Sequence, residues 1–125
     1  MSVYGFNNNL EKVPVITLSG TLSVPAGDVG TITWNTSALT NAGIDANSLV
    51  NYAVLDVLHS YDQEYWSSGV QSGFTSAGAG SYPNQIHPFP IVKFDTYSKQ
   101  ITLQDYTGDT SAQTKYYKVR LIKVT

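Results

Sequence analysis

Side chains of the types that bind metal ions are concentrated in one short stretch, residues 56–64. Asp56, His59, Asp62 and Glu64 lie within it, and carboxylates and imidazole are common metal ligands. Their spacing matches neither the His-Glu-x-x-His motif of a helix nor a calcium-binding EF-hand loop. On a strand, Asp56 and His59 would point to opposite faces, because successive side chains alternate. We therefore predict solvated polar groups at the end of a strand, with no metal and no cofactor.

The usual signatures of catalysis and of nucleic-acid binding are also missing from the sequence. It has two histidines, His59 and His87, and no Gly-x-Ser-x-Gly elbow that would present a nucleophilic serine. The glycine-rich residues 69–80 lack the Lys-Ser or Lys-Thr ending of a phosphate-binding loop. The most basic stretch, Lys115–Arg120, alternates as a strand does, in a chain whose pI is about 5.4. We predict that the protein is not an enzyme, has no catalytic residues and binds no nucleic acid.

Aromatic residues supply the candidate binding residues. The chain has nine tyrosines, whose flat ring and hydroxyl group suit both sheet faces and contact surfaces. Two irregular segments carry the side chains that we predict to bind a partner: Tyr4 and Phe6 near the N-terminus, and Tyr61, Tyr65, Trp66, Phe74 and Tyr82 in a long loop over residues 61–89. The alternative is that the rings of this loop fold back and cap one end of the domain.

The length and composition of the chain are those of one ordinary folded domain. The chain has 125 residues, of which 42% are hydrophobic and 13% charged, about half the usual charged fraction. This balance argues against disorder, and the absence of cysteine excludes disulfides and cysteine-based zinc sites. The first 92 residues hold one basic and six acidic side chains, whereas the remainder holds six basic and three acidic ones. This asymmetry would suit head-to-tail contacts between copies or an acidic partner for the C-terminal strand, but a solvated strand face is the simpler interpretation.

The N-terminal segment has a composition unlike the rest. Residues 1–12 include the run Asn7-Asn8-Asn9, and we predict an extended arm, anchored by Tyr4 and Phe6, before a single β-sandwich domain over residues 13–125. The segment has neither the basic region nor the apolar region of a signal peptide. No apolar run approaches the ~20 residues that cross a bilayer, so we expect no membrane partner.

Alternation of apolar and polar residues predicts an all-β fold. The clearest pattern runs over residues 13–24, where Ile16, Leu18, Leu22 and Val24 share a face and Gly20 suggests a bend or bulge. Further strands are predicted over residues 29–34, 49–59, 91–95, 99–105 and 114–124, with one short helical turn near 38–48. About six to eight strands separated by turns and long loops predict an antiparallel β-sandwich or jelly roll. The predicted core residues are Trp34, Val54, Leu55, Leu103, Val119 and Leu121.

Two stretches resemble small β-domains of tailed-bacteriophage virions, a group that includes head decoration proteins, head fibres and tail-fibre tips. The residues Lys115–Thr125 resemble the terminal strand of such domains, and Gly20–Gly27 resembles their opening hairpin. Low charge and loops rich in Ser, Thr, Asn and Gly fit the same group. Because the sequence shows no stalk, coiled coil or collagen-like repeat, it looks more like a stand-alone decoration protein than a fibre fragment.

The resemblance implies a structural role on the surface of a virion. We expect a capsid decoration or cement protein that is made in the host cytoplasm and binds the major capsid protein or another virion protein. Closed symmetric assemblies are common, so we expect a homo-oligomer, and a trimer is favoured because capsid decorations often lie on three-fold axes. The alternative is a receptor- or glycan-binding tip module of a phage tail or adhesin, which the aromatic loop 61–89 would serve.

Overall fold

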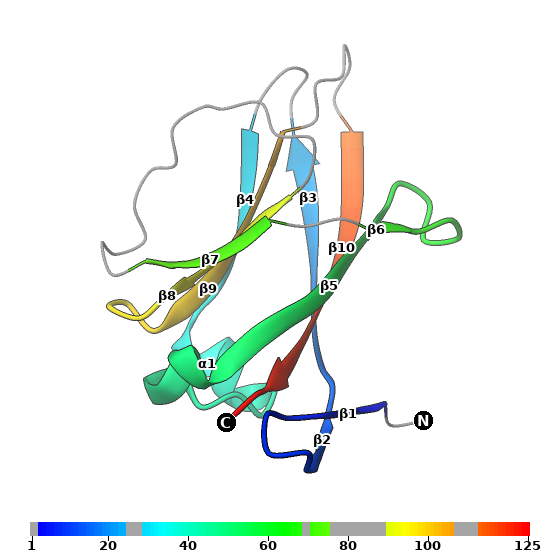
Figure 1. Cartoon of the computed structure of the whole chain (residues 1–125). Coiled ribbons are helices and arrows are strands. Elements are labelled where there is room, and N and C mark those ends of the chain that lie inside the picture. Colours follow the sequence, from blue (N-terminus) through cyan, green and yellow to red (C-terminus); the bar gives the residue numbers. More distant parts are fainter. Residues whose placement is uncertain (1–2, 25–28, 69–70, 76–89, 107–112) are drawn as a thin grey trace.

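The computed structural model describes residues 3–24, 29–68, 71–75, 90–106 and 113–125. This part of the chain contains ten strands and two short helices (Figure 1). The strands are β1 (Tyr4–Phe6), β2 (Lys12–Pro14), β3 (Ile16–Val24), β4 (Val29–Trp34), β5 (Tyr52–Ser60), β6 (Ser67–Ser68), β7 (Gln71–Thr75), β8 (Ile91–Asp95), β9 (Gln100–Tyr106) and β10 (Gln113–Lys123). The helices are α1 (Thr36–Asn41) and the 3-10 helix η1 (Ala46–Asn51).

Two four-stranded sheets lie face to face and form a β-sandwich. The β10 sheet has the strand order β3-β10-β5-β6, and the β9 sheet has the order β4-β9-β8-β7. Neighbouring strands are antiparallel except for the parallel pair β7 and β8. The predicted all-β, mainly antiparallel sandwich is therefore confirmed. More strands are seen than expected because β1, β2 and β6 have only two or three residues each. The prediction of a loop over residues 61–89 was also wrong in part, since β6 and β7 lie within it and β7 pairs with β8.

Strand β3 shows the predicted alternation, but Gly20 has a different role from the one predicted. Its neighbours stay in continuous register with β10, so Gly20 is no bulge. A β-carbon at Gly20 would lie 2.9 Å from Ile32 Cδ1 and 3.1 Å from Trp34 Cζ2. The missing side chain thus lets Trp34 of the opposite sheet approach closely, and its indole Nε1 donates a hydrogen bond to the Ser19 carbonyl at 3.1 Å. The predicted strand over 13–24 is split, because β2 pairs with β1 and β3 pairs with β10.

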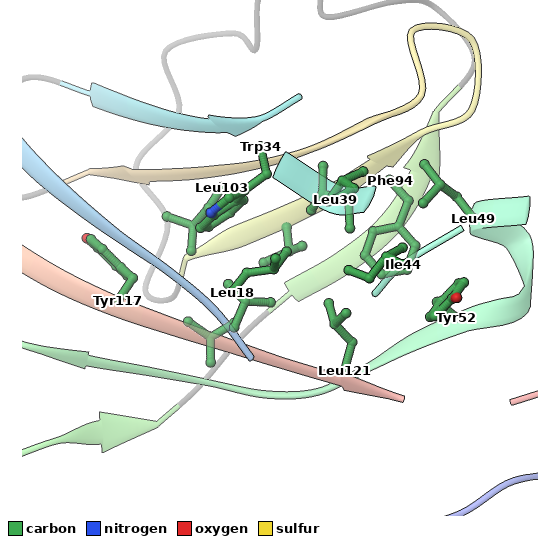
Figure 2. Close-up of a cluster of buried hydrophobic side chains, with 14 of the residues drawn as sticks. Leu18, Trp34, Leu39, Ile44, Leu49, Tyr52, Phe94, Leu103, Tyr117 and Leu121 are labelled. Atoms are coloured by element: carbon green, nitrogen blue, oxygen red, sulfur yellow. The ribbon is translucent and has the colours of Figure 1, made fainter. Parts of the chain in front are cut away.

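The core lies between the two sheets and continues under the helices (Figure 2). Four of the predicted core residues are buried, namely Trp34, Leu103, Val119 and Leu121. Val54 is partly buried and packs against this core. The prediction for Leu55 was wrong, since its side chain is 51% exposed. The pairing of β5 with β10 shifts register between Arg120 and Leu121, which leaves Leu55 as the extra residue of a bulge.

Two helices close one end of the sandwich, where the sequence predicted one turn. The Asn35 side chain accepts a hydrogen bond from Ala38 N at 2.9 Å and caps α1. Leu39 and Leu49, one from each helix, are buried and complete the core there. Because η1 includes Leu49, the following strand begins at Tyr52 and not at Leu49 as predicted. No helix among the described residues is long and apolar enough to cross a bilayer.

The N-terminal segment folds back as a hairpin, where the sequence predicted an extended arm. Strands β1 and β2 pair with each other beside the end of β10, close to the C-terminal residue (Figure 1). Asn8 N donates to the Val124 carbonyl at 3.0 Å, and Val15 N donates to the Val3 carbonyl at 2.8 Å. A β-carbon at Gly5 would lie only 2.6 Å from Ile122 Cδ1, so the hairpin covers this buried side chain. We call residues 4–14 the N-terminal hairpin.

Candidate functional site

The structure separates the predicted binding residues into two groups at opposite ends of the β10 sheet. Tyr4 and Phe6 lie on the N-terminal hairpin. Tyr61, Tyr65 and Trp66 lie in the turn between β5 and β6, near the other end of β10 (Figure 1). Of the remaining two, Phe74 is placed only by its backbone in β7, and Tyr82 lies outside the described residues. The predicted binding residues therefore do not form one continuous surface in the described part of the chain.

The outward face of the N-terminal hairpin carries two exposed rings. Gly5 faces Ile122, and because side chains alternate along a strand, Tyr4 and Phe6 point the opposite way. Tyr4 is 51% exposed and Phe6 is 70% exposed. Lys12 is paired with Phe6 across the hairpin, and its Nζ lies 4.4 Å from the centre of the Tyr4 ring. This face thus combines two aromatic rings with one cation that is held against them.

The tip of the hairpin is fixed by the side chain of Asn7. Its Oδ1 accepts hydrogen bonds from Asn9 N and Glu11 N, both at 2.9 Å, and its Nδ2 donates to Glu11 Oε1 at 3.1 Å. The tip holds Leu10 at a φ of 60°, a left-handed conformation that is uncommon for leucine. The Leu10 side chain is 83% exposed. The hairpin therefore presents a third large apolar group on an ordered turn, close to Phe6 in sequence.

The turn after β5 is organised by Asp62. Its Oδ1 accepts hydrogen bonds from Glu64 N at 2.8 Å, from Tyr65 N at 2.9 Å and from Ser60 Oγ at 2.9 Å. These bonds, the one from Tyr65 most of all, lower the pKa of Asp62 below its ordinary value. Tyr65 is exposed on this turn, whereas Trp66 is half-buried against Lys118. An Asp-centred turn of this kind fixes where both rings lie.

The four residues considered as metal ligands do not come together. Asp56 is on the outer face of the β10 sheet, where it pairs with Arg120. His59 is on the inner face, with its ring centre 6.2 Å from that of Tyr117. Asp62 is engaged in its turn, and Glu64 contributes its backbone N–H to the same turn. Among the described residues, no group of three or more His, Cys, Asp or Glu side chains is placed to share a metal ion.

A buried polar cluster that was not predicted from the sequence joins the two sheets. Lys115 Nζ of β10 lies 3.0 Å from Asp105 Oδ2 of β9, and Tyr117 Oη donates a hydrogen bond to the same oxygen. The lysine ammonium also lies 5.1 Å from the centre of the Tyr61 ring. Lys115 has the same parity as Tyr117, Val119 and Leu121, the inward positions of the predicted last strand. Because side chains alternate along a strand, this position places the Lys115 side chain on the inward face, and the sequence pattern therefore contained the signal of a buried cation.

Burial and charge in this cluster shift the pKa values of its neighbours. Burial, followed by the hydrogen bond with Asp105, raises the pKa of Tyr117 far above its usual range, so this hydroxyl stays protonated. Burial and the charge of Lys115 lower the pKa of His59 below 6.5, while Asp105 acts in the opposite direction. The cluster is thus a neutral imidazole and a neutral phenol around one ion pair. The ion pair of this cluster joins the two sheets, and the exposed Tyr61 ring lies beside its ammonium group.

No model of a known protein family, no curated protein sequence and no solved structure matches this chain.

Proposed function

We propose that this chain is a non-enzymatic structural protein that docks on another protein through the N-terminal hairpin, and that it decorates the capsid of a tailed-phage virion. The observation that carries the docking role is the exposed trio Tyr4, Phe6 and Leu10 on a hydrogen-bonded hairpin. Single exposed apolar side chains are common on proteins, but three gathered on one small element are typical of a contact surface. The virion setting rests on the resemblance of Lys115–Thr125 and Gly20–Gly27 to virion β-domains.

The order of the hairpin favours it as a docking element. A flexible arm would lose conformational entropy on binding, which weakens the complex. Here Asn7 fixes the tip before any partner arrives. Asn8 N bonds to the Val124 carbonyl just after β10, and Gly5 lets the hairpin pack closely on Ile122. Aromatic rings that are already positioned are the usual anchors of protein interfaces. The hairpin face therefore suits a partner with an apolar groove.

The cation on this face adds a requirement for the partner. Lys12 lies over the Tyr4 ring and forms no ion pair within the described part of the chain. An acidic side chain at the rim of the partner's groove would complement it. A capsid protein with an apolar groove and an acidic rim meets both conditions. If the chain is also a trimer, three such hairpins would engage the particle together and raise the overall affinity.

The docking role is tested by cosedimentation with phage particles purified from the source culture. We expect the wild-type protein to sediment with the particles, and the variant Tyr4→Ser/Phe6→Ser to remain in the supernatant. The matched control is Tyr97→Ser, because Tyr97 is also a strongly exposed ring but lies in the turn between β8 and β9. All of these side chains are exposed, so the melting temperatures should differ little.

Two results would contradict the proposal. If the wild-type protein does not sediment with the particles, and mass spectrometry does not detect it in them, the virion setting is wrong. If it sediments and Tyr4→Ser/Phe6→Ser sediments equally well, the hairpin is not the docking surface. Deleting residues 2–10 is a less informative test than the point variants. It would also uncover Ile122, which the hairpin buries.

A further inference from the structure

The outer face of the β10 sheet is hollowed along its length. One hollow, of about 420 Å³, is lined by Val15, Thr17, Lys118 and Arg120 among others. A second, of about 260 Å³, has Ser19, Thr21, Trp66 and Lys118 among its lining residues. Lys118 lines both, so the two hollows are neighbours at this side chain. We call the two hollows together the outer groove.

The outer groove has a wall at each end. At one end the N-terminal hairpin contributes Pro14, and the neighbouring Val3 and Val15 line the same hollow. At the other end the turn after β5 contributes Gln63 and Trp66. Between them, β3 supplies a row of exposed hydroxyl side chains, Thr17, Ser19 and Thr21, which pair across the sheet with Arg120, Lys118 and Tyr116. The groove thus has an apolar group at each end, Pro14 and Trp66, with the polar Gln63 beside Trp66 and hydroxyl groups along β3.

The charge in the middle of the outer groove is not neutralised by any residue that the structure describes. Arg120 forms an ion pair with Asp56, with its Nε 2.7 Å from Asp56 Oδ1. Lys118, by contrast, makes no ion pair with any described residue, and its Nζ lies 4.3 Å from the centre of the Trp66 ring. A cation–π contact attracts the ammonium group but does not neutralise it. Its N–H donors remain available to an anionic ligand group.

Trp66 gives the groove an apolar surface of defined orientation. It follows the Asp62-centred turn and is half-buried, so its ring is fixed and still accessible. The electron-rich face of an indole ring attracts polarised C–H groups as well as cations. Such C–H groups line the flat face of a sugar ring, whose hydroxyl groups would meet Gln63 and the β3 hydroxyls at the rim.

From this juxtaposition we propose that the outer groove binds a saccharide that carries an isolated carboxylate or sulfate group. On binding, the flexible Lys118 side chain moves off the Trp66 ring and the sugar ring packs in its place. The sugar hydroxyl groups bond to Ser19, Thr21 and Gln63, and the acidic group accepts a hydrogen bond from the displaced Lys118 ammonium. A charged hydrogen bond of this kind strengthens affinity more than a neutral one. This inference goes beyond the proposed docking role, because it uses a different face of the molecule and a different class of ligand.

Two other ligand classes fit the groove less well. An extended peptide could add to the open edge of β3, but Trp34 Nε1 already occupies the Ser19 carbonyl in the middle of that edge. A nucleic acid would bring a row of phosphates, and Asp56 together with the net charge of −2 disfavours such a polyanion. A ligand with a single acidic group avoids both conflicts.

The proposal is tested by isothermal titration of the full chain with four probes: sialyllactose, a glucuronate-containing disaccharide and 3′-sulfolactose, each with a single acidic group, and hexaglutamate, with lactose as the uncharged control. We expect at least one acidic saccharide to bind and lactose to bind at least about tenfold more weakly. Lys118→Met should lower that affinity by about tenfold or more, which corresponds to the loss of one charged hydrogen bond. The matched control is Lys123→Met, another exposed lysine of β10 that does not line the groove.

The aromatic contact is tested separately. Trp66→Ala should abolish binding of the same saccharide and Trp66→Phe should retain part of it, while Tyr97→Ala should bind as the wild type does. Melting temperatures show whether each variant is folded. If Trp66→Ala does not fold, the saccharide site is judged from Lys118→Met alone. Tyr4→Ser/Phe6→Ser should bind the saccharide normally, so the docking role can fail without affecting this result.

Three outcomes would overturn the saccharide site. The first is that the folded wild-type protein binds none of the acidic saccharides. The second is that Lys118→Met and Lys123→Met bind equally well. The third is that hexaglutamate binds more tightly than every saccharide and loses affinity in Lys118→Met, which would make the outer groove a site for acidic peptides.

Discussion

Strand β10 carries one ion pair on each of its faces, and the surroundings of the two pairs differ. On the inner face, the side chains of Lys115 and Asp105 are 10% and 4% exposed. On the outer face, those of Arg120 and Asp56 are 37% and 30% exposed. Asp105 belongs to β9 of the opposite sheet, whereas Asp56 belongs to β5 of the same sheet. The inner pair therefore joins two sheets, and the outer pair joins two strands that backbone hydrogen bonds already connect.

The comparison shows that geometry alone does not tell how much an ion pair matters. The outer pair has the better geometry, because the Nε and Nη2 atoms of Arg120 bond to the two oxygens of Asp56. Water nevertheless solvates both groups when they separate, so such a pair contributes ~0–1 kcal/mol. The inner pair has lost most of its water, and each group depends on its protein partners. Removing one member of the inner pair should therefore cost much more.

The largest expected effect is that of Asp105→Ala. The substitution leaves the Lys115 ammonium buried without its carboxylate and removes the acceptor of Tyr117 Oη. We expect the free energy of unfolding to fall by ~3–5 kcal/mol, measured by urea denaturation. The control is Lys115→Met/Asp105→Leu, which removes both charges and should lie much closer to the wild type. If Asp105→Ala costs under ~1 kcal/mol, the lysine reaches water more easily than its burial indicates.

A smaller effect is expected for Gly20→Ala, which changes the spacing of the sheets that the inner pair joins. The new methyl group would meet Ile32 and Trp34 at about 3 Å and force the core to adjust. We expect a loss of ~1–3 kcal/mol, as is typical of overpacked cores. The comparison is Gly5→Ala, which meets only the flexible end of Ile122 and should cost less. Equal losses in the two variants would show that the contact between β3 and β4 is looser than described.

A still smaller effect is expected on the outer face. Asp56→Asn removes the charge that faces Arg120 and should lower the free energy of unfolding by less than ~1 kcal/mol. Because the pair is solvated, the difference between variant and wild type should shrink further as salt is added. A loss as large as that of Asp105→Ala would contradict the contrast between the two faces.

The smallest expected effect is a change in how the free energy of unfolding depends on pH. It comes from His59, which lies beside Lys115, Asp105 and Tyr117 on the inner face. Its pKa is lowered on folding from 6.5, so the unfolded chain binds this proton more readily than the folded one. Stability from this source is therefore complete above pH 6.5 and is lost as the pH falls below it. We expect His59→Gln to flatten the stability profile between about pH 7.5 and pH 5. An unchanged slope would show that His59 is solvated in the folded state.

Local alternation in the sequence was sufficient to predict the sandwich but not its exceptions. The inward positions Val119 and Leu121 follow directly from period-two spacing. Leu55 is exposed because of a bulge, which depends on how β5 meets a strand more than sixty residues away. Asp105 and Lys115 became partners only when two strands of different sheets were brought face to face. A pattern within one strand cannot show which side chain will lie opposite it.

The candidate binding surfaces show the same limit. The asparagine run at residues 7–9 suggested an extended arm. Asparagine side chains also build turns, and Asn7 does so here through its bonds to Asn9 and Glu11. The outer groove could not be predicted from the sequence, for a stronger reason. Its walls come from the hairpin, β3 and the turn after β5, which only the folded sheet brings together.

The place of β10 in its sheet has a consequence for how the chain acquires its structure. It lies between β3 and β5 but follows both in the chain, and the hydroxyl contact between Ser23 and Thr114 spans 91 residues. Until β10 is synthesised, β3 and β5 have no common partner, and their edges are open to other chains. Sandwiches with such distant pairings fold slowly, typically in milliseconds to seconds. Crowded nascent chains are therefore most exposed to aggregation before β10 inserts, and folding should be completed only after β10 has left the ribosome.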